Sequence, residues 1–208
     1  MSSASRERIL ARIGSALKTP SAPLSFEPKA IFPPIGNLAE RFQAECKGNY
    51  TECVFVDVHE STAKLKQVLA SVGSGSVFAE DAPRIRELLR DFNGPLQWSS
   101  EGRPLESSVA TISRVEALIA ATGSLLVTSS CGGRGASIVA PVHIVIANAN
   151  QLVPDIESAL DLANERKLSE KNSYVGVITG CSRTADIEKL LVIGAHGPKR
   201  LAVIVENS

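Results

Sequence analysis

The sequence predicts an α/β fold, with a Rossmann-like mixed, mostly parallel sheet and helices on both of its faces. Three observations lead to this class. The 208 residues are 44% hydrophobic and 21% charged, which is the composition of an ordinary folded domain. Short β-rich runs alternate with amphipathic segments along most of the chain. Strands that are separated by helices of about ten residues need crossover connections, and these favour parallel pairing.

The first 36 residues are expected to form an amphipathic helix followed by a proline-rich arm. Apolar residues recur at helical spacing over residues 3–18, and charged residues occupy the remaining face. Residues 19–36 hold five of the 11 prolines, which excludes a helix interior or a central strand there. The helix has to dock on its own domain or on a neighbouring subunit, and the second case implies a homo-oligomer. Residues 37–208 are expected to form a single α/β domain.

The first half of this domain alternates regularly between helix and strand. Apolar spacing of a helical period predicts helices over residues 38–46, 61–72 and 82–92, the last one opened by Pro83. Runs rich in Val and Phe predict strands over residues 53–58 and 76–79.

The second half is richer in strands. Residues 117–121 and 124–128 flank Thr122 and Gly123, so they form either a tight hairpin or a helix followed by a strand, and we favour the hairpin. Further strands are expected over residues 142–147, 174–179 and 200–205, with helices over residues 155–167 and 185–191.

Charge and hydropathy exclude several classes of protein. The formal charge is zero, so nothing in the whole sequence favours nucleic acid as a partner. No apolar run reaches the roughly 18 residues that a membrane-spanning helix needs. The amino-terminal segment interleaves arginines with apolar residues and does not read as a secretory signal, so we expect a cytoplasmic protein. The four cysteines, Cys46, Cys53, Cys131 and Cys181, are too scattered to form a local zinc or iron–sulfur site.

Two loops are candidates for ligand binding because each follows a predicted strand, where α/β proteins bind ligands. The first comprises residues 128–137. Its Gly132 and Gly133 allow a bound group to approach the backbone, and Arg134 is suited to clamping a carboxylate or a phosphate. The loop lacks the signatures of dinucleotide folds and P-loops, so a solvated Arg134 in an empty loop is the competing interpretation.

The second candidate loop comprises residues 178–188. Ser182 or Thr184 is placed to cap the helix expected over residues 185–191. Arg183 is then a cation at a helix amino terminus, which is unfavourable unless an anion is nearby. That anion is either a ligand or the carboxylate of a structural ion pair.

The histidines and cysteines of these loops give no catalytic assignment. His196 lies in a turn fixed by Gly197 and Pro198, and it either contacts a ligand or stabilises the turn. His143, inside an apolar run, is expected to be a hydrogen-bonded core residue. Cys131 and Cys181 occupy positions where a lowered thiol pKa is expected, but neither has a base nearby in sequence.

Several segments of the second half, in order, resemble the LutC/YkgG family, whose members carry the LUD (lactate utilisation) domain. Residues 121–125, ATGSL, resemble the family's ETGTL segment. Residues 141–145, PVHIV, and 151–155, QLVPD, resemble its PPVHI and IVPD segments. Residues 179–188, TGCSRTADIE, and 191–200, LVIGAHGPKR, resemble its carboxyl-terminal signature. The ordered combination is more specific than any single segment, and it covers residues 110–206.

The resemblance implies a fold similar to the NagB/RpiA/CoA-transferase class. It also implies a role in oxidising L-lactate to pyruvate beside iron–sulfur partner proteins that carry the clusters, with no cofactor in this chain. The resemblance therefore favours an accessory or ligand-binding subunit of such a system. The alternative from the residues alone is a stand-alone enzyme or binding protein for a small anionic substrate, similar to a phosphosugar or a CoA ester.

The sequence departs from the family pattern at three places. Ala121 stands where the family usually has Glu, and Cys181 stands where it often has Pro. The loop over residues 129–137 is also richer in glycine than the family's version. If the usual Glu is catalytic, its replacement by Ala121 removes that activity from this chain.

Overall fold

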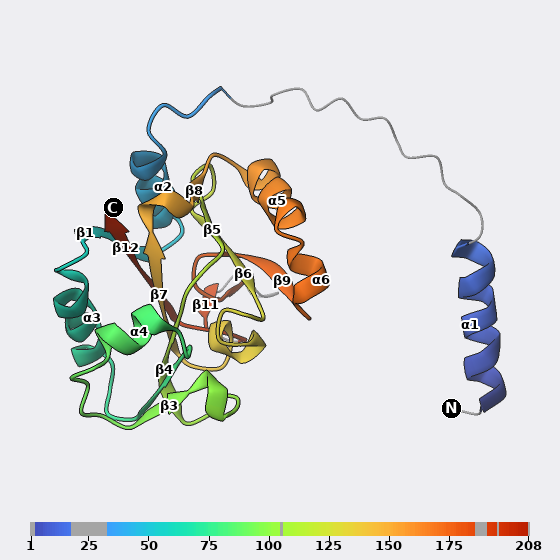
Figure 1. Ribbon diagram of the computed structural model, residues 1–208, viewed down its shortest axis with the longest axis horizontal. Helices are drawn as coiled ribbons and strands as arrows, with labels where there is room; N and C mark the ends of the chain where they lie inside the picture. Colours follow the sequence, from blue (N-terminus) through green and yellow to red (C-terminus); the bar gives the residue numbers. More distant parts are fainter. Residues whose placement is uncertain (1–2, 18–32, 105, 186–190, 195, 208) are drawn as a thin grey trace. The chain divides into compact units, whose positions relative to one another are not determined.

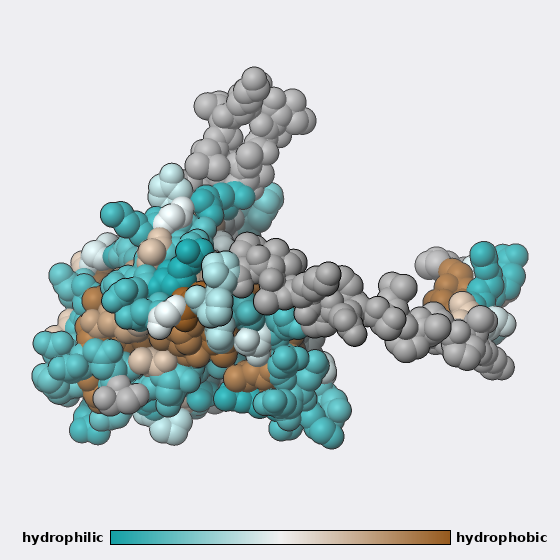
Figure 2. Space-filling view, turned by 90° about the horizontal axis from the view of Figure 1, so that it is seen from above, coloured by the Kyte–Doolittle hydropathy of each residue, from teal (hydrophilic) through white to brown (hydrophobic). Residues whose placement is uncertain are grey.

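A computed structural model of the protein describes residues 3–17, 33–104, 106–185, 191–194 and 196–207. The chain divides into two compact units, Met1–Pro33 and Pro34–Ser208. In the first unit, helix α1 spans Ser3–Leu17, within the segment where an amphipathic helix was expected. Ile9, Leu10 and Ile13 are about half exposed, and Figure 2 shows hydrophobic beside hydrophilic side chains on this helix. Most of the predicted proline-rich arm, residues 18–32, lies outside the described residues.

The second unit is built on a six-stranded sheet in which every neighbouring pair of strands is parallel. The order across the sheet is β1-β12-β7-β4-β2-β3. The strands are β1 (Thr51–Asp57), β2 (Ser76–Ala79), β3 (Leu96–Trp98), β4 (Ser108–Ser113), β7 (Val142–Asn148) and β12 (Arg200–Asn207). The mostly parallel α/β class predicted from the alternation of elements is therefore confirmed.

Both faces of this sheet are buried. On one face, Leu65 of α3 (Ser61–Ala70) and Ile85 of α4 (Pro83–Leu88) pack against Ile144 and Ile146 of β7. Val145 of the same strand points to the other face, into a second core. This alternation explains why the central strand reads as a continuous apolar run.

A second sheet covers the other face, with strand order β8-β5-β6-β9. Its strands are β5 (Ala117–Ile119), β6 (Ser124–Thr128), β8 (Leu152–Val153) and β9 (Val175–Thr179). Its inner side shares the second core with α2 (Leu38–Gly48), and its outer side packs against α5 (Ile156–Glu165) and α6 (Leu168–Lys171). Figure 1 shows α3 and α4 on one side of the strands, with α5 and α6 on the other.

The predicted hairpin is confirmed, because β5 and β6 pair antiparallel, with Leu118 opposite Leu125. The residue that ends α2, Asn49, contacts the turn of this hairpin. The side-chain amide of Asn49 donates to the carbonyl oxygen of Thr122 at 2.7 Å. Gly123 has a φ of +62°, and a Cβ at this position would lie only 2.8 Å from the backbone nitrogen of Cys46. The contact with α2 therefore requires glycine at this position of the turn.

The predicted helix over residues 185–191 is wrong at both ends. Strand β10 (Arg183–Ala185) pairs antiparallel with β11 (Leu191–Ile193), and residues 186–190 lie outside the described residues. The backbone of Ser182 is already paired, since its N–H donates to Pro198 and its carbonyl accepts from Gly194. These long-range hydrogen bonds lead the chain into β10, so the helix that Ser182 or Thr184 was expected to cap does not begin at Ala185.

Candidate functional site

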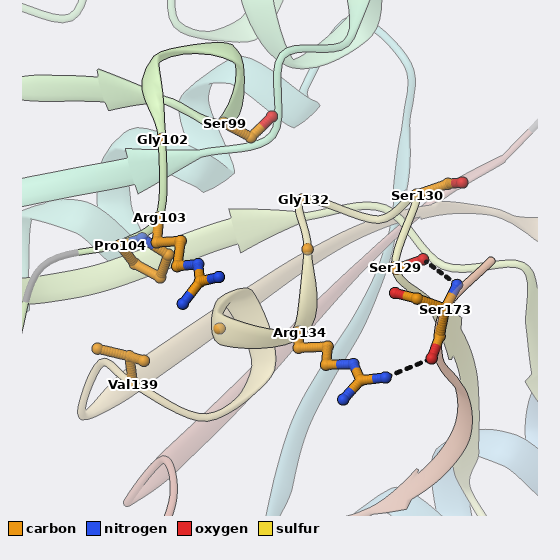
Figure 3. A pocket seen from close by; sticks show the side chains of 12 residues that line it. Ser99, Gly102, Arg103, Pro104, Ser129, Ser130, Gly132, Arg134, Val139 and Ser173 are labelled. Carbon is orange, nitrogen blue, oxygen red and sulfur yellow. Dashed lines mark hydrogen bonds between the residues drawn. The ribbon is translucent and has the colours of Figure 1, made fainter.

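A cavity with a volume of about 780 Å³ lies between two loops (Figure 3). One loop follows β3, the other is the glycine-rich loop that follows β6, and Ser173 completes the wall. All of its lining residues are small, apolar, hydroxylic or basic: Ser99, Gly102, Arg103, Pro104, Ser129, Ser130, Gly132, Gly133, Arg134, Gly135, Val139 and Ser173. We call this space the arginine cavity. It contains the first candidate set, Gly132, Gly133 and Arg134.

The glycine-rich loop is held against the sheet by close packing. Gly132 has a φ of +80°, and a Cβ there would lie 3.2 Å from the Cβ of Ala136 and 3.4 Å from the Cβ of Glu80. The Thr111 hydroxyl of β4 donates to the carbonyl oxygen of Ala136. Gly133 has a φ of +85° and would meet nothing within 4 Å, so this side of the loop is open. The loop is therefore packed at Gly132, against Ala136 and Glu80, and it is open at Gly133.

Arg134 extends from this loop and is exposed (Figure 3). Its Nη2 donates to the carbonyl oxygen of Ser173, and its guanidinium lies 5.8 Å from the centre of the Tyr174 ring. No carboxylate of the described residues pairs with it. The guanidinium is positioned by neutral partners and keeps its charge uncompensated.

Arg103 enters the same cavity from the opposite loop, and sequence reasoning missed it (Figure 3). Its carbonyl oxygen accepts a hydrogen bond from the Gln97 side chain at 3.1 Å, which fixes the backbone of the loop. Its guanidinium has no ion pair within the described part of the chain. Arg103 stands in an irregular loop beside Gly102 and Pro104, where no periodicity or motif singles it out.

An ion pair between the buried Glu80 and the half-exposed Arg114 lies beneath the glycine-rich loop. Glu80, which is 3% exposed, accepts hydrogen bonds from the backbone nitrogen of Arg114 at 2.6 Å and from its Nε at 2.9 Å. These bonds join the carboxyl end of β2 to that of β4. They also engage the carboxylate of Glu80, the residue whose Cβ packs beside Gly132.

The expected lowered thiol pKa at Cys131 is not supported. Burial raises the pKa of the Cys131 thiol, and the Glu116 carboxylate, 3.9 Å away, opposes the thiolate further. Cys181 precedes strand β10 rather than the helix that was expected to follow it.

The second candidate set lines a different cavity of about 390 Å³. Ser182, Arg183 and His196 contribute to its wall, whereas Thr184 lies in β10. The Arg183 guanidinium lies 5.4 Å from the centre of the Tyr50 ring, and no described carboxylate pairs with it. The structure therefore places the two candidate arginines in separate cavities. Ligand binding at either set stays a prediction.

His143 is a core residue, as its apolar run predicted. It is 1% exposed, and its Nε2 lies 2.8 Å from the Ser113 hydroxyl. Its Nδ1 finds no hydrogen-bond partner among the described residues, and burial lowers the pKa of the ring to about 4. The imidazole is therefore neutral near pH 7, while His59 and His196 are exposed.

The described residues contain neither a metal-binding cluster nor a membrane-spanning helix. No group of three or more His, Cys, Asp or Glu side chains is arranged there to hold a metal ion. Likewise, no described helix combines the length and the apolar character needed to cross a membrane.

The fold and the cavity together define a class of protein, an α/β domain of two stacked sheets with an arginine-lined cavity between its loops. The family model of the LUD domain matches residues 102–205, which contain most of that cavity. The chain belongs to the LUD domain family, which confirms the resemblance drawn from its motifs.

The relatives and a solved structure agree with this assignment. Lactate utilization protein C of Geobacillus sp. (strain WCH70) is 31% identical over 193 residues, covering 81% of this chain and 77% of that protein. The protein of the same name from Bacillus subtilis (strain 168) is 27% identical over 178 residues, covering 77% and 74%. A DUF162 family protein from Deinococcus radiodurans has a similar fold, with a TM-score of 0.63 at 14% identity, covering 82% of this chain and 96% of that one.

Proposed function

We propose that this chain is a lactate utilisation protein that acts as an accessory or ligand-binding subunit of a system oxidising L-lactate to pyruvate. Membership of the LUD domain family and the similarity to proteins named Lactate utilization protein C over most of the chain support this role. L-Lactate releases two electrons and two protons on becoming pyruvate. We assign the electrons to iron–sulfur clusters on partner proteins, and we assign to this chain the binding of a small anion.

The observation that carries the binding role is the arginine cavity. Arg103 and Arg134 bring two uncompensated positive charges to a space that no acidic side chain lines. Arginine forms paired hydrogen bonds with carboxylates and phosphates, and these bonds are about twice as strong as neutral ones. A cavity of this kind favours an anionic ligand over a neutral one.

The position of Ala121 bears on whether the chain is itself catalytic. Ala121 lies in the turn between β5 and β6, where its N–H donates to the carbonyl oxygen of Pro154 at 2.8 Å. It lines neither the arginine cavity nor the second cavity. The position at which the family usually has Glu therefore lies outside the residues that line the two candidate cavities.

Growth and co-purification test the proposal. A strain lacking this chain should fail to grow on L-lactate but grow normally on glucose, and the wild-type chain should restore growth. Affinity purification from lactate-grown cells should recover iron–sulfur proteins with the chain. Normal growth of the deletion strain on L-lactate, together with a chain that purifies alone, would contradict the role.

A second candidate is a stand-alone enzyme or binding protein for a phosphosugar-like or CoA-ester-like substrate. The volume of the arginine cavity favours it, because about 780 Å³ is the size of pockets that enclose drug-sized ligands and greatly exceeds the needs of a three-carbon acid. The purified chain should then turn over such a substrate without partner proteins. Turnover that requires added iron–sulfur proteins would exclude this candidate.

A further inference from the structure

We infer that the arginine cavity recognises the phosphate group of an organic phosphate, held jointly by Arg103, Arg134 and the glycine-rich loop. This rests on the proposed function, because it names the chemical class of the ligand that the same cavity binds. It extends that function in two ways. It adds Arg103 to the binding residues, and it predicts that L-lactate itself is not the preferred ligand of this chain.

The charge around the cavity calls for a ligand with two negative charges. Three acidic residues that adjoin its walls are engaged with other partners, and the exposed Glu106, which lies beyond Pro104, pairs with neither arginine within the described residues. Glu80 is bound by Arg114, Asp81 is paired with Arg86, and the carboxylate of Glu101 accepts from the backbone of Trp98 at 2.9 Å. Two guanidinium groups therefore remain uncompensated. A phosphate monoester carries about −1.5 to −2 charges at pH 7, whereas lactate carries one.

Hydrogen-bond donors also gather at the cavity. No acceptor among the described residues takes the backbone N–H of Gly132, Arg134 or Gly135. Arg134 uses only Nη2 for Ser173, which leaves Nε and Nη1 available. A group with three terminal oxygens can accept from several such donors at once, as phosphates do at glycine-rich loops.

The rest of the cavity suits an organic portion. Pro104 of the loop after β3 and Val139, which follows the glycine-rich loop, both line the cavity with apolar surface, and Val139 is 37% exposed. A phosphate at the arginines leaves most of the volume of about 780 Å³ for the remainder of the ligand. Lactate would leave this space filled with water and the apolar surface without contact.

The test titrates the full-length chain with inorganic phosphate, pyrophosphate and L-lactate at equal ionic strength, by calorimetry. We expect phosphate or pyrophosphate to bind at least about tenfold more tightly than lactate. Tighter binding of inorganic phosphate points to a monoester ligand, and tighter binding of pyrophosphate points to a diphosphate ligand. Arg103→Gln and Arg134→Gln should each raise the Kd for the tighter of the two by about tenfold or more, since each removes a charge-assisted contact.

Matched controls separate loss of binding from loss of structure. Arg90→Gln removes the charge of an exposed arginine outside the cavity and should leave the Kd unchanged. Arg103→Lys and Arg134→Lys keep the charge but lose the planar fork, so they should restore part of the affinity. Each variant is compared with wild type in thermal unfolding without ligand, because Arg134→Gln also removes the contact with Ser173.

Three results would overturn the inference: no binding of phosphate or pyrophosphate, a Kd that neither arginine variant changes, or lactate binding as tightly as phosphate. The growth test distinguishes these failures from failure of the proposed function. If phosphate does not bind but the deletion strain still fails to grow on L-lactate, the inference of phosphate recognition is wrong and the proposed role in lactate utilisation is supported. If phosphate binds through the arginines but the deletion strain grows normally on L-lactate, the proposed role in lactate utilisation is wrong instead.

Discussion

His143 shows how a single buried side chain couples stability to pH. Burial lowers the pKa of its ring to about 4, below the ordinary value of 6.5. Between these values the unfolded chain binds a proton that the folded chain does not, so stability falls as the pH falls through this window. The sheet therefore carries a neutral imidazole whose protonation favours unfolding.

We predict that the wild-type chain loses about 2 kcal/mol of unfolding free energy through this residue between pH 7 and pH 5. His143→Gln keeps a polar side chain beside Ser113 but does not titrate, so its stability should change less over the same range. Urea unfolding of both proteins at the two pH values measures the difference. Equal losses in the two proteins would show that the ring is protonated in the folded state.

Gly123 is a second residue whose role follows from geometry. Its φ of +62° and the 2.8 Å approach to the backbone nitrogen of Cys46 leave no room for a side chain. Gly123→Ala should lower the unfolding free energy by about 3 kcal/mol, because it adds backbone strain to a clash with α2. Gly73→Ala is the matched control, since a Cβ there meets nothing within 4 Å and its φ is not positive. Similar denaturation midpoints for the two variants would contradict the close packing of Gly123 against α2.

At the scale of elements, long-range contacts determine the secondary structure at places where local sequence patterns are misleading. Ser182 and Thr184 are good helix caps in isolation, but the backbone of Ser182 pairs with Pro198 and Gly194 and directs the chain into β10 and β11. Strand β4 was not predicted, because Ser and Thr interrupt its apolar residues. Two of its polar side chains have distant partners, since Thr111 donates to Ala136 and Ser113 contacts His143. No local pattern reports such contacts.

The Glu80–Arg114 pair joins β2 to β4 beneath the glycine-rich loop. Glu80→Gln keeps the shape but removes the charge, so it should lower the unfolding free energy by about 2 kcal/mol. Glu165→Gln, at an exposed position of α5, should change it by less than about 0.5 kcal/mol. Chemical denaturation of the three proteins at pH 7 provides the comparison. If Glu80→Gln lowers the unfolding free energy no more than Glu165→Gln does, the Glu80–Arg114 pair does not stabilise the loop.

At the scale of the whole molecule, the sequence predicted the mostly parallel sheet, the hairpin of β5 and β6, and the loop that contains Gly132, Gly133 and Arg134. These features have local causes, namely apolar runs, a turn and a cluster of glycines after a strand. Arg103 could not be found in this way. It meets the glycine-rich loop only because that loop and the loop after β3 form opposite walls of one cavity.

The most direct test of the arginine cavity as the functional site is growth on L-lactate with the double variant Arg103→Gln/Arg134→Gln. The variant is expressed in the deletion strain at the abundance of wild type, with Arg90→Gln as the control. We predict that the double variant fails to restore growth, whereas wild type and Arg90→Gln restore it fully. Growth of the double variant at the wild-type rate would show that lactate utilisation does not depend on this cavity.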